Sequence, residues 1–396
     1  MVLGDDIVVG VVGAGAMGTG IAHVAAGAGH RVLLGDASPD ATASAKRYID
    51  KALDRDVDKN RISRNEADAL RGRIEFWKDS LGDDLSAFAS CGLVIEAIVE
   101  DADVKQALFS RLEDFVPAET VLATNTSSLS IASIASVCRQ PARVLGLHFF
   151  NPAPIMPLVE VVPWMGTAPL LASTAYAAMT RWNKTPVLAS DTPGFIVNRI
   201  ARPFYGEAIR ILEEGIADAS TIDWAMKELG KFRMGPFELM DFIGNDVNYA
   251  VTRSVFDAFY YDPRYRPSIT QRRLVESRFF GRKSGRGYYD YRDGAERPAP
   301  NQDAVRGQAI LNRILAMLIN EAVDAVLMCV ASPEDVDLAM TRGVNYPKGL
   351  LAWGEELGLD RVLATLEGLQ SEYGEDRYRP SALLKRMVRD KRRFFA

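Results

Sequence analysis

Cysteine and histidine are both scarce in this chain of 396 residues, which contains three of each. The cysteines, Cys91, Cys138 and Cys329, are odd in number and widely spaced, a pattern that argues against a disulfide framework and against a zinc site. Such thiols are typical of buried side chains in a reducing compartment.

Long apolar runs and a strong charge of one sign are also missing. No apolar run reaches the ~20 residues that a membrane-spanning helix needs. The N-terminal stretch lacks the basic region and the cleavage site of a signal peptide. A formal net charge of −5 gives no long-range attraction to nucleic acid or to anionic lipid. These absences predict a cytoplasmic protein that binds neither nucleic acid nor membranes.

The first half of the chain has the pattern of a doubly wound α/β sheet. Residues 7–12, "IVVGVV", form a β-branched run that is typical of a parallel strand buried on both faces. A glycine-rich turn, a helix of small residues and a second apolar run complete a βαβ unit. Further apolar strands recur as far as "PVLAS". The sequence therefore predicts a Rossmann-type domain over residues 1–188.

From "DTPGFIVNR" onward, long amphipathic patterns replace the strands, so the rest of the chain is predicted to be all-α. This part contains an internal repeat with a shift of 114 residues. Asn198-Arg199-Ile200 falls on Asn312-Arg313-Ile314, and Glu207-Ala208 falls on Glu321-Ala322. One residue of slippage then brings together two copies of "YRPS".

The repeat sets the domain limits that we expect in the second half. Two tandem helical repeats are predicted over residues 189–292 and 305–396. The segment 293–304, rich in proline and charge, is predicted to be the linker between them.

A glycine-rich loop follows the first strand and predicts a dinucleotide site. Gly13 permits the tight turn, Gly15 leaves room for a pyrophosphate, and Gly18 lets the helix pack on the strand. The second strand ends at Asp36, where a carboxylate can hold ribose hydroxyls. No arginine follows it to accept a 2′-phosphate, which favours NAD over NADP. The alternative is a structural turn with an incidental aspartate.

His148 and Glu160 lie in two apolar strands, "VLGLHFF" and "PLVEVV", joined by the loop "NPAPIMP". Because the chain runs out and back, we expect the two side chains to face each other. A carboxylate among valines needs a partner, and an imidazole that supplies one becomes a better base at its other nitrogen. The alternative is a core histidine beside an unrelated edge glutamate.

The remaining histidines and the basic segments favour structural interpretations. His23 lies on the first helix and His30 lies in the turn before the second strand, where packing or surface roles are expected. No spacing of histidine, cysteine or acidic residues indicates a metal site. The basic C-terminal run "KRMVRDKRRFF" is typical of a solvated helix face or tail.

The order of motifs resembles that of the 3-hydroxyacyl-CoA dehydrogenase family. The resemblance rests on "GAGAMGTGIA", "VIEAIVEDADVKQALF", "ATNTSSLSI", "GLHFFNPAPIMPLVEVV", "DTPGFIVNR", "GPFELMDFIG" and "GRKSGRGYYDY". It covers about residues 5–292, and the second helical copy resembles the duplicated C-terminal domain of some members. The segment "GVNYPKGLLAWGEELG" is most similar to bacterial members assigned to 3-hydroxyadipyl-CoA or 3-hydroxybutyryl-CoA oxidation.

The resemblance implies catalytic roles for four residues. His148 would be the general base and Glu160 the carboxylate that orients it. Ser127 and Asn198 would hydrogen-bond the substrate oxygen or the base, and Ser127 would also contact the cofactor. A core serine and a helix N-terminal cap are the alternatives for Ser127 and Asn198.

The resemblance also implies an NAD site beyond the glycine loop. Asn151 would lie near the nicotinamide, Glu100 and Lys105 would line the cofactor site, and Met17 and Asp36 would lie on its adenosine side. Exposed helix charges are the alternative for Glu100 and Lys105.

Together these features predict NAD-dependent, reversible oxidation of an (S)-3-hydroxyacyl-CoA to the 3-oxoacyl-CoA, as in fatty acid β-oxidation or phenylacetate catabolism. Two rivals stay open: a β-hydroxyacid dehydrogenase acting on free acids, and a non-catalytic, crystallin-like NAD-binding protein. Asn312 repeats Asn198 without a second nucleotide fold, so one active site per chain is expected. The chain would be a monomer with a pseudo-dimeric helical module or a homo-oligomer.

Overall fold

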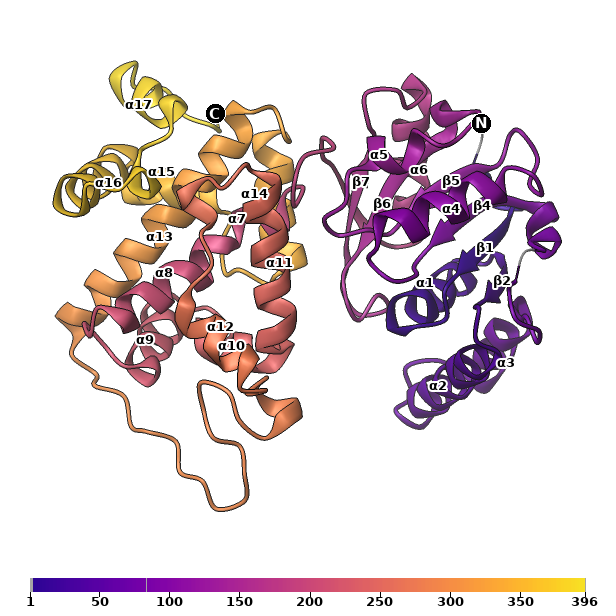
Figure 1. Ribbon diagram of the computed structural model, residues 1–396, viewed down its shortest axis with the longest axis horizontal. Coiled ribbons are helices and arrows are strands. Elements are labelled where there is room, and N and C mark those ends of the chain that lie inside the picture. The colour runs from indigo at the N-terminus through magenta and orange to yellow at the C-terminus, as the bar shows by residue number, and fades with distance from the viewer. Residues whose placement is uncertain (1–2, 83, 396) are drawn as a thin grey trace. The chain divides into compact units, whose positions relative to one another are not determined.

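A computed structural model describes residues 3–82 and 84–395, and the chain divides into two compact units (Figure 1). The first unit ends at Thr192 and the second begins at Pro193. The first contains an eight-stranded sheet with flanking helices, and the second is helical. The predicted fold class is therefore confirmed. No helix among the described residues is long and apolar enough to cross a bilayer.

The sheet has the strand order β3-β2-β1-β4-β5-β6-β7-β8. All neighbouring strands are parallel except β6 and β7, which are antiparallel. Because the chain moves outward from β1 to β3 and then returns to place β4 beside β1, the order reverses there, and ligands bind at such reversal points. The strands are β1 (Val8–Val12), β2 (Arg31–Gly35), β3 (Ile74–Phe76), β4 (Cys91–Glu96), β5 (Val121–Thr124), β6 (Val144–Phe149), β7 (Leu158–Val162) and β8 (Thr185–Leu188).

Helices cover both faces of this sheet. Buried residues of α1, α2 and α6 form one core with alternate strand residues such as Val9 and Val11, whereas Phe109 of α4 and Ile131 of α5 lie outside this core. Side-chain caps start several helices, including a capping box between Ser63 and Glu66 at α3. The helices are α1 (Ala16–Gly27), α2 (Pro39–Asp58), α3 (Arg64–Arg73), α4 (Ala102–Leu112), α5 (Ile131–Ala135) and α6 (Pro169–Arg181), with short 3-10 helices at Ser86–Ser90 and Pro141–Arg143.

The second unit contains two series of helices in the same order, in which the first two helices of the first series correspond to one long helix of the second. The first series is α7 (Val197–Ile200), α8 (Arg202–Glu213), α9 (Ala219–Trp224) with a π-helical turn at Ala225–Leu229, α10 (Pro236–Ile243), α11 (Asn245–Ala258), η4 (Pro263–Tyr265) and α12 (Ile269–Glu276). The second series is α13 (Ala304–Leu327), α14 (Pro333–Gly343), α15 (Leu350–Leu357), α16 (Leu359–Tyr373), η6 (Asp376–Tyr378) and α17 (Ala382–Arg389). Between the two series, residues 293–303 form a turn followed by irregular chain, with no helix or strand.

The two copies repeat each other in local detail. The Asp223 carboxylate accepts the backbone N–H groups of two residues at the start of α10, and Asp337 does the same at the start of α15. A Cβ atom on Gly235 or Gly349 would collide with the corresponding aspartate. The same capping device, 114 residues apart, explains why these glycines recur in both copies.

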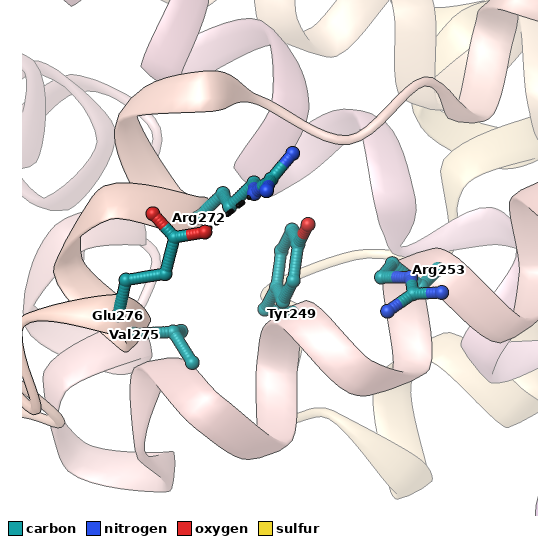
Figure 2. A pocket seen from close by; sticks show the side chains of 5 residues that line it. All are labelled: Tyr249, Arg253, Arg272, Val275 and Glu276. Carbon is teal, nitrogen blue, oxygen red and sulfur yellow. Dashed lines mark hydrogen bonds and ion pairs between the residues drawn. The ribbon is translucent and has the colours of Figure 1, made fainter.

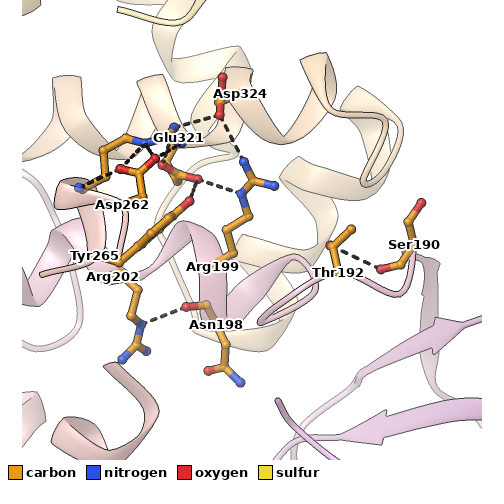
Figure 3. A network of polar contacts seen from close by, with 10 residues as sticks. Ser190, Thr192, Asn198, Arg199, Arg202, Asp262, Tyr265, Glu321 and Asp324 are labelled. Carbon is orange, nitrogen blue, oxygen red and sulfur yellow. Dashed lines mark hydrogen bonds and ion pairs between the residues drawn. The ribbon is translucent and has the colours of Figure 1, made fainter. Parts of the chain in front are cut away.

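Two buried ion pairs also link the two copies reciprocally. Arg199 of the first copy donates to Glu321 of the second at 2.7 Å, and Arg313 of the second donates to Glu207 of the first at 2.6 Å. Tyr265 and Tyr378 donate their hydroxyls to the same two glutamates. Figure 3 shows the contacts around Glu321. Equivalent residues thus contact each other's partners, which is the geometry of a two-fold symmetric interface within one chain.

The buried ion pairs between the two copies should stabilise the second unit far more than a surface ion pair does. We expect Glu321→Gln to lower the free energy of unfolding by about 3 kcal/mol, because it leaves two arginines without a full counter-charge. Its matched control is Glu276→Gln, whose exposed pair with Arg272 should contribute less than about 0.5 kcal/mol. Urea denaturation of the two variants measures the difference, and similar losses would contradict it.

Candidate active site

Polar side chains of the first unit gather at the carboxyl ends of its central strands. Gly13 follows β1, Asp36 follows β2, Glu96 ends β4, and Asn125 follows β5. Parallel sheets bind ligands at this edge, beside the point where the strand order reverses. The candidate residues of the first unit are Gly13, Gly15, Met17, Gly18, Asp36, Glu100, Lys105, Ser127, His148, Asn151 and Glu160, and Asn198 alone lies in the second unit.

The three glycines of the loop have different reasons to lack a side chain. Gly13 has a φ of +106°, and a Cβ atom there would lie 2.4 Å from the Ala97 carbonyl oxygen. A Cβ on Gly18 would lie 1.7 Å from the carbonyl oxygen of Gly13. A Cβ on Gly15 would meet nothing within 4 Å. Packing therefore demands glycine at 13 and 18, whereas at 15 glycine leaves an open space.

That open space lies at the N-terminus of α1. Gly15 caps the helix without a side-chain hydrogen bond, and the first turn carries no acidic residue. The first amides of a helix have no intrahelical acceptor, so they can bind an anionic group such as a pyrophosphate. Met17, in the same turn, is partly buried against the core.

Asp36 connects this loop to the end of β2. One carboxylate oxygen accepts the backbone N–H of Ala14 at 2.7 Å, and the other accepts that of Ser38 at 2.8 Å. A carboxylate has about four acceptor sites, so Asp36 retains capacity for ribose hydroxyls. The open cradle at Gly15 and the acceptor at Asp36 together fit NAD.

A buried ion-pair network lies at the ends of β4 and β5. Lys105, 1% exposed, contacts the Glu96 carboxylate at 2.5 Å and that of Glu100 at 3.2 Å. Thr124 donates its hydroxyl to Glu96 at 2.6 Å. The interpretation of Lys105 as an exposed helix charge is therefore wrong. Glu96 was not recognised from the sequence, although a carboxylate at the end of the apolar run "GLVIE" was a visible signal.

Glu100 also holds the serine loop that follows β5. Its Oε1 accepts the hydroxyl of Thr126 at 2.7 Å and the backbone N–H of Ser127 at 2.8 Å, and the Ser127 hydroxyl lies 3.2 Å from the same oxygen. Partial burial alone would raise the pKa of Glu100, but Lys105 and these donors together hold it below its usual value. The Ser127 side chain thus takes part in a polar network rather than in the apolar core.

His148 and Glu160 face each other across the antiparallel pair of β6 and β7. They are directly paired in the register, and His148 Nδ1 lies 2.6 Å from Glu160 Oε2. Glu160 is completely buried and His148 is 6% exposed. The predicted pairing of these two strands is confirmed. With the ring proton on Nδ1, the imidazole donates to Glu160, and Nε2 is then the nitrogen that can accept a proton.

Two residues that sequence reasoning missed hold the chain on either side of this pair. Asn125 accepts the backbone N–H of Phe149 through its side-chain oxygen at 2.8 Å. Lys184 donates to the carbonyl oxygens of Ala153 and Met156 in the loop between β6 and β7. Asn151 is an exposed residue of that loop.

Asn198 is the second residue of α7, whose N-terminal cap is Ile196, so the cap interpretation of Asn198 is wrong. Its backbone carbonyl accepts a hydrogen bond from Arg202 at 2.8 Å.

The other two histidines have structural surroundings. His30 is buried and accepts the indole N–H of Trp182 at 2.8 Å. His23 is partly buried, and burial lowers its pKa. Among the described residues, no group of three or more histidines, cysteines and acidic residues is placed to hold a metal ion.

A surface pocket of the second unit lies between α11 and α12 (Figure 2). Arg272 on its wall is paired with Glu276 at 2.7 Å. The pocket contains none of the candidate site residues, and we assign it no part in the reaction. Its lining consists of Tyr249, Arg253, Arg272, Val275 and Glu276.

Two family models match almost the whole chain. The NAD binding domain of 3-hydroxyacyl-CoA dehydrogenase matches residues 8–192. The C-terminal domain of 3-hydroxyacyl-CoA dehydrogenase matches twice, at residues 194–291 and 310–393. This C-terminal domain model therefore matches each of the two helical copies, which agrees with the repeat in the sequence.

Similar proteins carry related names. The chain is 40% identical to the 3-hydroxyadipyl-CoA dehydrogenase of Escherichia coli K12, over 95% of this chain and 96% of that protein. It is 40% identical to the human mitochondrial hydroxyacyl-coenzyme A dehydrogenase, over 71% of this chain and 90% of that protein. A crystal structure of 3-hydroxybutyryl-CoA dehydrogenase from E. coli K12 superposes with a TM-score of 0.90 at 38% identity, covering 96% of this chain and 98% of that one.

Substitutions in the glycine loop should separate folding from cofactor binding. Gly15→Ala places a methyl group in open space at an ordinary φ of −69°, so the variant should keep the wild-type melting temperature. The methyl group would occupy the pyrophosphate space, and NADH affinity should fall about tenfold or more. Gly18→Ala should instead unfold or destabilise the domain. Thermal melts and NADH fluorescence titrations check both, and normal NADH affinity in Gly15→Ala contradicts the assignment.

Lys184 should make stability depend on pH. Burial lowers its pKa to about 8, whereas an unfolded lysine titrates near about 10.4. The folded state therefore loses the proton first, and its contribution to stability rises with pH between these values. Urea unfolding of wild type and Lys184→Met should show the wild-type free energy of unfolding gaining on the variant across this window. A constant difference would count against a depressed pKa.

Proposed function

Because the chain belongs to the 3-hydroxyacyl-CoA dehydrogenase family and is an NAD-dependent oxidoreductase, we propose that it oxidises (S)-3-hydroxyacyl-CoA to 3-oxoacyl-CoA reversibly, with His148 as the proton acceptor. The observation that carries the proposal is the 2.6 Å contact between His148 and the buried Glu160. It supplies an oriented base at the sheet edge that also carries the glycine loop.

The proton chemistry follows from the His148–Glu160 contact. Glu160 accepts the Nδ1–H, which leaves Nε2 to take the proton of the C3 hydroxyl. The imidazolium that forms is then stabilised by the Glu160 carboxylate on its other side, which is completely buried and therefore little screened by water. NAD, when bound, accepts the hydride from C3.

The substrate oxygen needs donors that hold it beside the base. We assign this role to Ser127 and Asn198. Ser127 is already held by Glu100 through its backbone and hydroxyl, so its position is set before substrate arrives. Asn198 lies in the short helix α7, and the residue that follows it, Arg199, is held by its ion pair with Glu321.

The cofactor would be held by the loop and by the network at the ends of β4 and β5. Gly13, Gly15 and Gly18 would shape the pyrophosphate cradle, and Met17 and Asp36 would lie at the adenosine end. Glu100 and Lys105 would line the nicotinamide half with Ser127 and Asn151. The lysine is neutralised by two carboxylates, so this half of the site presents no net positive charge.

We place the NAD-binding domain at residues 1–188, the first helical copy at 189–292, the linker at 293–304 and the second copy at 305–396. The division of the chain after Thr192 supports a boundary shortly after residue 188. The reciprocal charge exchange supports a pseudo-dimeric helical module, in a monomer or a homo-oligomer. We propose a cytoplasmic location.

Reduction of acetoacetyl-CoA with NADH tests the proposal. Wild type should turn it over, and His148→Gln should lower kcat by about a thousandfold, because in this direction His148 donates the proton to the C3 oxygen and general acid–base catalysis contributes about 10²–10⁴. NADH affinity should stay within about twofold, since His148 lies outside the glycine loop.

Free 3-hydroxy acids are the control substrates. Turnover of free acids alone would favour the β-hydroxyacid dehydrogenase alternative. Equal activity of wild type and His148→Gln would remove the proposed base.

A further inference from the structure

Arg202, at the start of α8, is a buried cation whose contacts are all neutral. It is 6% exposed. Its Nε donates to the backbone carbonyl of Asn198 at 2.8 Å, its Nη1 donates to the Thr252 hydroxyl at 3.1 Å, and it lies 5.1 Å from the Tyr205 ring centre. Within residues 3–82 and 84–395, no carboxylate pairs with it. The other buried arginines of this unit, Arg199, Arg313 and Arg377, each pair with glutamates.

A second polar group without a partner lies beside this arginine. The hydroxyl of Tyr346 is buried and has no hydrogen-bond partner in the described part of the chain. Burial lowers the pKa of Arg202 and raises that of Tyr346, and each group partly offsets the other's shift. A guanidinium stays charged even so, and a buried charge without a counter-ion is costly. An anion from outside the chain would satisfy both groups.

The internal repeat shows that this polar cluster is not part of the helical scaffold. A shift of 114 residues places an apolar residue opposite every member of the cluster. The pairs are Arg202 with Ala316, Tyr205 with Ile319, Thr252 with Leu366, and Tyr346 with Phe232. The scaffold therefore folds with apolar side chains at these four positions, and only one of the two equivalent places is polar.

Arg202 follows Asn198 by one helical turn. Figure 3 shows the guanidinium and the side-chain amide of Asn198 pointing the same way, away from the network of Arg199 and Glu321. Four residues of helix span about 6 Å. If Asn198 holds the C3 oxygen, as the proposed function requires, a group a few carbons further along the acyl chain reaches Arg202.

We propose that Arg202 and Tyr346 bind a carboxylate at the far end of the acyl chain, so that the preferred substrates are short 3-hydroxyacyl-CoA thioesters of dicarboxylic acids. The inference rests on the proposed function, because it takes Asn198 as the binder of the C3 oxygen. A guanidinium binds a carboxylate through strong charge-assisted hydrogen bonds, and the phenol donates a further one. Arg202 is then a specificity-determining residue, and the second helical copy contributes Tyr346 to the substrate site.

Two substrates of equal length test this proposal. The preference of the enzyme is the ratio of kcat/KM for 3-hydroxyadipyl-CoA to that for 3-hydroxyhexanoyl-CoA, which lacks the terminal carboxylate. Arg202→Met should lower this ratio about 100-fold, mainly through KM, because it removes a buried charge partner. Tyr346→Phe keeps the ring and should lower it about fivefold. The control Arg361→Met removes an exposed charge on α16 and should leave the ratio unchanged.

Stability gives a second readout that a merely structural arginine would not produce. Without substrate, Arg202→Met replaces an uncompensated buried cation by an apolar side chain of similar length. Its melting temperature should therefore rise by about 2–4 °C. A lower melting temperature together with equal losses on both substrates would make Arg202 a structural residue and overturn the proposal.

Ligand binding keeps this test separate from the test of the reaction. Calorimetry should show wild type binding adipyl-CoA more tightly than hexanoyl-CoA, with the preference lost in Arg202→Met. If this preference appears without turnover of either substrate, the proposed reaction fails and the carboxylate site stands. If wild type uses both hydroxyacyl substrates equally well, the carboxylate site fails and the reaction stands.

Discussion

The Glu160 carboxylate, completely buried among the valines of β7, is stable there because His148 lies directly opposite and shares a short hydrogen bond with it. The two residues are paired by the antiparallel register of β6 and β7, the one place where this sheet departs from parallel order. A one-residue slip would turn the glutamate to the other face and separate the pair. The chemistry of the site therefore depends on the register of one hairpin.

The same requirement, that a buried charge has a partner, accounts for the architecture elsewhere. Lys105 contacts Glu96, at the end of β4, and Glu100. Glu100 in turn holds the serine loop after β5. In the second unit, Arg199 and Arg313 each cross to a glutamate of the other helical copy. Removing one partner of such a pair costs more than the pair itself contributes, so these contacts hold a unique arrangement. Arg202 stands apart because its contacts are neutral.

The sequence predicted the features whose signal is local. Gly13, Gly15 and Gly18 occur between a strand and a helix, and together with Asp36 at the end of the second strand this spacing is typical of a dinucleotide site. His148 and Glu160 flank a loop short enough to require a hairpin, so their contact followed from counting residues.

Contacts between distant segments could not be predicted from the sequence in the same way. The contact of Thr124 with Glu96 needs β5 to lie beside β4, and Asn125 becomes relevant only once β5 lies beside β6. The repeat was visible, but the exchange of Arg199 and Arg313 needs the symmetry that relates the copies. A linear shift of 114 residues does not contain that symmetry.

Fusion of the two helical copies in one chain has a consequence for the substrate site. In a symmetric dimer every substitution appears twice, so a position that meets its own symmetry mate carries the same residue on both sides. Here the equivalent residues Phe232 and Tyr346 lie with ring centres 5.0 Å apart, and one has gained a hydroxyl that the other lacks. Arg202 likewise stands opposite Ala316. A duplicated chain can carry a cation and a phenol at one set of positions and keep the equivalent positions of the other copy apolar. This divergence is the physical advantage of two copies in one chain over two chains.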